Sequence, residues 1–171
     1  MMPAWCESAM SAAALAPRGE RTENEERALL RRSGVPIAAD PAGFAADFYT
    51  RLFERQPELR RLFPSGFAAQ QHKFAHLLTQ LLDALERPQE LGRTLAELGR
   101  RHRGYGAKFV HYLAVGEALI ETLAARNGEA FCARTRLAWA RLFSWVVYRM
   151  RHADPDGATR IARREPVTQP G

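Results

Sequence analysis

The sequence predicts an all-α fold built as one domain. No stretch of the 171-residue chain alternates polar and apolar residues for long enough to form a strand. Apolar residues instead recur at intervals of three and four positions, which is the period of one face of a helix. Proline and glycine separate these stretches, as they do where helices end. A chain of this length can bury a core without disulfides or a structural metal.

The first predicted helix is bounded by recognisable signals. Thr22 and Glu25 form a capping box at its start. Gly34 and Pro36 are residue types that end helices, so we expect this one to stop at Ser33. The later segments, read in the same way, are helices at 41–56, 67–85, 91–103, 109–125 and 130–151, with a short apolar piece at 59–63.

Two of these later helices have additional features. Asp40 is a residue type that caps a helix, and Pro41 is well tolerated in the first helical position. The last helix, 130–151, is apolar around much of its circumference, so we expect it to lie centrally.

We expect the folded domain to span residues 22–152. Residues 1–21 are rich in alanine and are expected to form a disordered arm, because they lack the basic start of a signal peptide and Glu7 interrupts their apolar stretch. Residues 153–171 contain mainly Asp, Gly, Pro, Arg and Thr, which predicts a flexible tail.

Composition argues against nucleic-acid and membrane partners. The net charge of +6 is carried almost entirely by arginine, and the arginines are scattered among acidic residues rather than gathered in a stripe. No apolar run approaches the ~20 residues of a membrane span. Cys6 and Cys132 have no CxxC spacing and are compatible with a reducing compartment. We therefore expect a cytoplasmic protein.

One histidine closes an apolar helical face. Leu91, Leu95, Leu98 and His102 follow one another at i, i+4, i+7 and i+11, and Gly104 comes just after them. A single buried histidine is most often a core residue bonded to a backbone carbonyl. The other interpretation is a ligand to the iron of a cofactor.

Two more polar side chains lie on apolar faces. Tyr49 is on the second predicted helix and Gln70 is on the third. Burying an unpaired amide costs about 1–3 kcal/mol, so each group needs a partner or a task. A flat cofactor lying between His102 on one side and Tyr49 and Gln70 on the other would explain all three polar side chains. The imidazole would then bind iron on one face, and the hydroxyl and amide would reach a ligand on the other.

The remaining histidines are weaker candidates for a metal ligand. His72 and His76 have the i, i+4 spacing of a zinc-binding pair. They share a side with Thr79 and Asp83 rather than with the apolar face, so we expect them on the surface. His111 stands at the start of a helix, where it could cap the helix or face solvent, and it is a distant second candidate for an iron ligand.

Taken in order, these residues resemble a bacterial globin of the single-domain type, similar to the haem domain of flavohaemoglobins. The pieces that carry the resemblance are residues 48–53 with Pro57, 62–63, Gln70 with Lys73, 98–102, 105–106, 111–112, 115–119 and 138–139. The resemblance extends from about Glu25 to His152. It implies a three-on-three helical sandwich around a pocket for haem b.

The resemblance also implies roles for individual residues. His102 matches the proximal iron ligand, and Tyr49 and Gln70 match the distal pair. Tyr112 matches a tyrosine that supports the proximal histidine together with a glutamate of the last helix, and here Asp154 is the nearest acid. The other residues expected at the haem are Phe48, Phe63, Lys73 (beside a propionate), Phe74, Leu77, Leu98, Val115 and Phe143.

The expected function is reversible binding of dioxygen or another diatomic ligand such as nitric oxide. A hydrogen bond to a charged group contributes about 1.5–3 kcal/mol, which slows ligand release roughly ten- to a hundredfold. Slow release suits the oxidation of nitric oxide to nitrate, for which a separate flavin reductase would supply electrons.

Two other interpretations remain open at this point. One is a haem-based sensor or electron-transfer globin with six-coordinate iron, in which Gln70, His72 or another side chain is the sixth ligand. The other is a haem-free helical interaction protein that has kept the same shape.

Overall fold

The structure is a computed structural model that describes residues 18–63, 67–87 and 91–152, and throughout these ranges the regular structure is helical. The all-α prediction is therefore confirmed. In chain order the elements are α2 (Arg18–Ala39), α3 (Pro41–Arg55), the 3₁₀ helix η1 (Pro57–Leu62), α4 (Phe67–Asp83), η2 (Ala84–Glu86), α5 (Leu91–Gly104), α6 (Phe109–Asn127), η3 (Gly128–Ala130) and α7 (Ala133–His152). In the described part of the chain, no helix is both long and apolar enough to span a bilayer.

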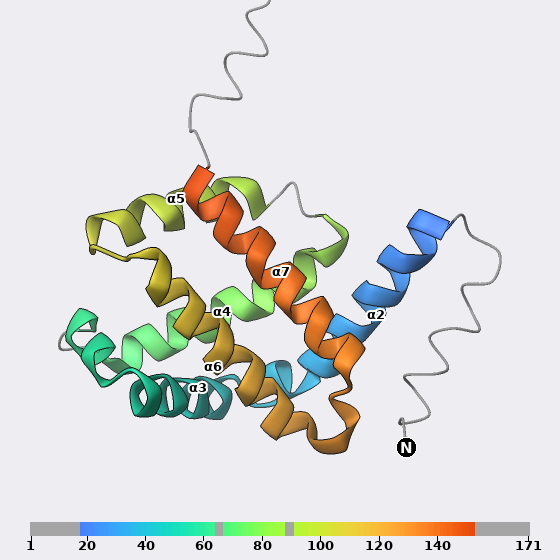
Figure 1. Cartoon of the computed structure of the whole chain (residues 1–171), viewed down its shortest axis with the longest axis horizontal. Helices are drawn as coiled ribbons and strands as arrows, with labels where there is room; N and C mark the ends of the chain where they lie inside the picture. Colours follow the sequence, from blue (N-terminus) through green and yellow to red (C-terminus); the bar gives the residue numbers. More distant parts are fainter. Residues whose placement is uncertain (1–17, 64–66, 88–90, 153–171) are drawn as a thin grey trace, which may run out of the picture.

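The helices form two layers of three that cross one another, as expected. One layer holds α2, α4 and α5, and the other holds α3, α6 and α7. Helices α6 and α7 run side by side across the molecule, and α3 lies along one edge (Figure 1). Contacts of α3 with α4, and of α7 with α2 and α5, join the two layers.

The prediction for the first helix is wrong at both ends. Helix α2 begins at Arg18 rather than Thr22 and continues through Gly34 and Pro36 to Ala39. Proline inside a helix costs about 3 kcal/mol. Here the helix continues because Ile37, one residue later, is fully buried in the core, and burial of such a side chain contributes about 1.5–3 kcal/mol.

Gly34 serves a close approach between helices rather than a helix end. A methyl group placed on it would lie 2.6 Å from Cδ1 of Leu82 on α4. Ser33, its neighbour, is buried and donates from Oγ to the carbonyl of Leu29 at 2.6 Å. The same Oγ accepts a hydrogen bond from Nε1 of Trp139 at 2.8 Å, which joins α2 to the buried face of α7.

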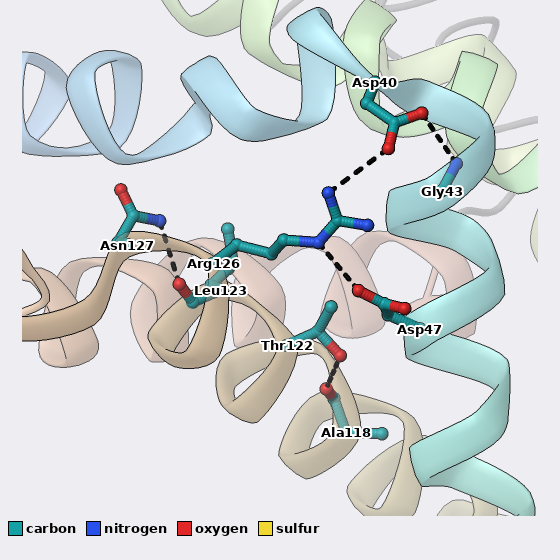
Figure 2. A network of polar contacts seen from close by, with 8 residues as sticks. All are labelled: Asp40, Gly43, Asp47, Ala118, Thr122, Leu123, Arg126 and Asn127. Atoms are coloured by element: carbon teal, nitrogen blue, oxygen red, sulfur yellow. Dashed lines mark hydrogen bonds and ion pairs between the residues drawn. The ribbon is translucent and has the colours of Figure 1, made fainter.

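A polar corner fixes α3 to the carboxyl end of α6. Asp40 caps α3 as predicted, because its Oδ1 accepts from the Gly43 backbone N–H at 2.9 Å. Arg126 of α6 lies between Asp40 and Asp47 and donates to both, as Figure 2 shows. The Gly43 bond and the Arg126 guanidinium lower the pKa of Asp40. Their stabilising contribution is therefore present above the ordinary carboxyl pKa and is lost as the pH falls.

The other predicted segments are confirmed with small changes at their ends. The apolar piece at 59–63 lies mostly within η1, and α4 ends at Asp83, where η2 continues to Glu86. Helix α6 extends to Asn127, and α7 begins at Ala133 after η3. The predicted arm and tail fall mainly on residues outside the described ranges.

Cys132 lies beside a hydroxyl group, because its Sγ is 3.4 Å from Oγ1 of Thr135. Cys6 lies outside the described residues, so the expectation drawn from the two cysteines stays a prediction.

Helix α5 crosses α7 at very short range. A methyl group placed on Gly99 would overlap the backbone carbonyl of Met150. Buried Leu91 and Leu95 of α5 pack with Val146 and Met150 in a small apolar cluster at the same crossing. The absence of a side chain at position 99 thus sets how closely α5 approaches α7.

We expect Gly99→Ala to lower the free energy of unfolding by about 1–3 kcal/mol, the usual cost of overpacking, even though alanine favours helix more than glycine does. Urea unfolding followed by circular dichroism measures this. Gly104→Ala is the matched control, because a methyl group there meets no atom within 4 Å. Equal stability of the two variants would contradict the close crossing.

Candidate functional site

One cavity of about 870 Å³ brings together the residues that the sequence singled out. Its size lies in the range of small-molecule and cofactor sites, and most of its lining is apolar. Side chains from both helical layers border it. The lining includes Phe48, Tyr49, Phe63, Gln70, Lys73, Phe74, Leu77, Leu98, His102, Tyr112, Val115 and Phe143.

His102 is held in one orientation by its own helix. Its Nδ1 lies 2.8 Å from the carbonyl oxygen of Leu98, one turn earlier on α5. A bond to a backbone carbonyl is expected for a buried histidine of either kind, a core residue or a metal ligand. With Nδ1–H donating to the carbonyl, Nε2 is the ring nitrogen that remains to ligate a metal. The half-buried ring borders the cavity.

Tyr112 of α6 stacks against the histidine. The two ring centroids are 6.1 Å apart, and the planes are 26° from parallel. Burial raises the pKa of Tyr112, and the positive charges of Arg103 and Arg151 oppose that effect. The charged groups that act on Tyr112 are thus cations. Asp154, the nearest acid in the sequence, lies outside the described residues.

Tyr49 is deeply buried at the cavity, with 3% of its surface exposed. Burial raises its pKa to about 12, against the smaller opposing effect of a hydrogen bond with Gln70. The phenol is protonated at physiological pH, as an ordinary tyrosine is, and burial extends this range to higher pH. Gln70, which comes from the first turns of α4, borders the same cavity.

A cluster of aromatic rings fixes Tyr49 in place. Phe63 and Phe74, both predicted at the site, lie at centroid distances of 5.5 and 5.6 Å from its ring. Phe67 lies 4.9 Å away and Phe53 lies 5.7 Å away. Sequence reasoning did not assign these last two to the site, although both stand on the apolar faces of helices that carry site residues.

The other predicted contacts have clear structural origins. Phe48 stacks on Phe74 with the centroids 4.2 Å apart, so α3 and α4 share one wall. Phe143 of α7 reaches the cavity where α6 and α7 cross closely, because a methyl group on Gly116 would lie 2.8 Å from its ring. Lys73 borders the cavity and is exposed, as a group that meets a propionate at the rim should be.

The remaining histidines differ in their relation to the cavity. His72 and His76 are both exposed, as predicted, but His76 also borders the cavity. His111 borders it too, and its Nδ1 accepts from the backbone N–H of Lys108 at 3.1 Å, so it caps α6. Within the described ranges, no three His, Cys, Asp or Glu residues gather as a metal cluster would require.

The site has the features that a haem requires. An apolar cavity of sufficient size accommodates a flat porphyrin, and one histidine has its second nitrogen committed to a carbonyl. A neutral phenol and an amide supply hydrogen-bond donors, and a lysine stands at the rim. Since a metal held by a porphyrin needs only one or two protein ligands, the lack of a larger ligand cluster in the described residues does not conflict with this use.

Comparison with known proteins agrees with the geometry. A profile of the globin family matches residues 46–150. Neuroglobin of Tetraodon nigroviridis is 27% identical over 145 residues, which cover 77% of this chain and 91% of that protein. The flavohemoprotein of Bordetella pertussis is 27% identical over 122 residues, covering 70% of this chain but 30% of that protein.

A solved structure shows the same fold. The engineered carbene transferase RmaNOD from Rhodothermus marinus superposes with a TM-score of 0.67 at 24% identity, covering 81% of this chain and 96% of that one.

We expect Tyr49 to titrate near pH 12, well above the ordinary value of 10, because the cavity desolvates its phenolate. Nuclear magnetic resonance of ring-labelled tyrosine measures this, and the Tyr49→Phe variant identifies the signal. Gln70→Leu should move the pKa further up, since it removes the bond that lowers it. A Tyr49 signal titrating near 10 would show that the ring is not buried.

Proposed function

This chain belongs to the globin family, and from that premise we propose that it holds haem b through His102 and binds dioxygen or nitric oxide beside Tyr49 and Gln70. Globins bind haem and use it to bind small ligands. The observation that carries the proposal is the convergence of His102, Tyr49 and Gln70, from three different helices, on one apolar cavity.

Haem iron supplies the position at which a diatomic ligand is held, and the protein supplies everything else. Leu98 fixes the ring and tautomer of His102 by accepting the Nδ1 hydrogen. The acceptor is a neutral carbonyl rather than a carboxylate, so it adds no negative charge to the histidine side of the cavity. Together with the nearby cations Arg103 and Arg151, this favours ligand binding over an electron-rich, peroxidase-like site.

Tyr49 and Gln70 act on the ligand. A neutral phenol held by its ring neighbours is an oriented donor, and the cavity excludes the water that would compete with it. Two donors to a ligand with negative partial charge slow its release, which suits chemistry on the ligand better than rapid transport. We infer that oxidation of nitric oxide to nitrate is the reaction that this arrangement serves, with electrons from a separate flavin reductase.

We expect His102→Ala to abolish the absorption bands of the ferrous protein with carbon monoxide, because the variant lacks the proposed iron ligand. The matched control is His111→Ala, which removes the other histidine of this region that borders the cavity. Absorption spectra of both variants after haem addition decide the assignment. If His111→Ala loses the spectrum and His102→Ala keeps it, the ligand is His111.

We expect Tyr49→Phe to speed oxygen release at least tenfold, because it removes a hydrogen bond of about 1.5 kcal/mol or more to the ligand. Stopped-flow displacement of oxygen by carbon monoxide measures the rate. Phe53→Leu serves as the control for altered packing, since it changes a ring next to Tyr49 without removing a donor. An unchanged rate in Tyr49→Phe would exclude the phenol as a distal donor.

We expect the ferrous protein, once mixed with oxygen, to consume nitric oxide stoichiometrically without a reductase and repeatedly with one. Stopped-flow absorption and nitrate analysis measure both. Reversible binding without nitrate formation would leave ligand storage as the function.

A further inference from the structure

An exposed apolar patch with a basic border lies where the end of α5, the start of α6 and the end of α7 meet. Its apolar members expose more than half of their surfaces: Tyr105 70%, Phe109 53%, Val110 57% and Leu113 52%. Three exposed basic residues stand beside them, and we call the whole set the corner surface. The basic members are Arg103, Lys108 and Arg151.

Contacts between the three helices hold the corner surface together. The guanidinium of Arg151, near the end of α7, lies over the ring of Phe109 in the first turn of α6, 5.0 Å from its centroid. Arg103 of α5 donates to the backbone carbonyl of Met150 on α7 at 3.1 Å. In Figure 1 the red end of α7 lies against α5. Residues distant in sequence therefore form one continuous surface.

In the described part of the chain, this surface carries a net positive charge. The sequence has no Asp or Glu between residues 98 and 116 or between residues 130 and 153. Within the described ranges, no carboxylate forms an ion pair with Arg103, Lys108 or Arg151, whereas nearby Arg101 pairs with Glu97. Unpaired surface cations steer an acidic partner toward the patch that they border.

The corner surface also adjoins the proposed iron ligand. Tyr105 borders the cavity as well as facing solvent, and it follows His102 by one turn of chain. Arg103 and Arg151 act electrostatically on Tyr112, whose ring stacks on His102. A protein bound to this surface would therefore approach the histidine side of the cavity.

We propose that the corner surface docks an acidic one-electron carrier protein with a flavin or iron–sulfur centre. The inference rests on the proposed function, since only a redox cycle needs such a partner. In each encounter the reduced centre of the carrier loses one electron and ferric haem iron gains it, and no atom is transferred. An apolar centre with a charged border, of modest area, is typical of transient redox interfaces, which bury less than about 1,200 Å².

Binding is measured with two oxidised acidic carriers, a plant-type ferredoxin and a flavodoxin, so that the readout does not depend on turnover. Each is titrated into the haem-loaded ¹⁵N-labelled protein, and amide shifts are followed at low and moderate salt. We expect shifts at residues 103–113 and at the end of α7, and an affinity that falls as salt rises.

Two double variants distinguish an effect of the corner surface on binding from an effect of net charge alone. Lys108→Glu with Arg151→Glu should weaken binding about tenfold or more. Arg61→Glu with Arg136→Glu makes the same change in net charge on other exposed residues and should have little effect. Val110→Ser with Leu113→Ser keeps the charge, so its weaker binding would show the contribution of the apolar centre. Equal weakening by both charge variants would overturn the proposal.

The other possible occupants are distinguished in the same experiment. Binding to phosphatidylserine–phosphatidylcholine vesicles without binding to either carrier would assign the surface to a membrane. Dimerisation that the Val110→Ser, Leu113→Ser variant abolishes would assign it to a second copy of the chain. A wild-type protein that takes up haem but binds neither carrier overturns the docking proposal alone. Failure to take up haem overturns the proposed function.

Discussion

The position of α5 against α7 is the constraint on which the cavity depends. Gly99 allows the two backbones to approach more closely than any side chain would permit. That approach places His102, one turn later on the same helix, at the wall of the cavity. The hydrogen bond to Leu98 then orients the ring within the helix itself. Tertiary packing thus positions the helix, and local geometry positions the ligand nitrogen.

The tyrosine side of the cavity depends on desolvation. Five neighbouring phenylalanine rings surround Tyr49, and desolvation of its phenolate raises the pKa of the hydroxyl to about 12. A neutral donor that cannot rotate freely is already arranged for its acceptor, so little reorganisation is needed when a ligand arrives. Gln70 adds a second polar group without introducing a charge into the apolar cavity. The same burial that stabilises the fold therefore prepares the site.

The histidine side has a different electrostatic character. His102 is bonded to a neutral carbonyl, and the charges acting on Tyr112 are those of Arg103 and Arg151. These arginines are also part of the corner surface. The same two arginines thus act electrostatically on Tyr112 and form part of an exposed basic surface. This surface arises because the ends of α5 and α7, each rich in basic residues, meet the start of α6, which Lys108 precedes.

The sequence by itself determined the features that depend on neighbouring residues. The helices and the apolar face that ends in His102 follow from spacings of three and four, and the Asp40 cap follows from residue type. Resemblance to a known family supplied the remaining site residues.

Only the tertiary structure decided the rest. The first helix passes Pro36 because distant groups bury Ile37, and Gly34 is small because Leu82 lies against it. Packing between helices brings Phe67 into contact with Tyr49 and places the guanidinium of Arg151 over the ring of Phe109. Helical periodicity fixes which face a residue occupies, but the partner of that face is set by contacts far apart in the chain.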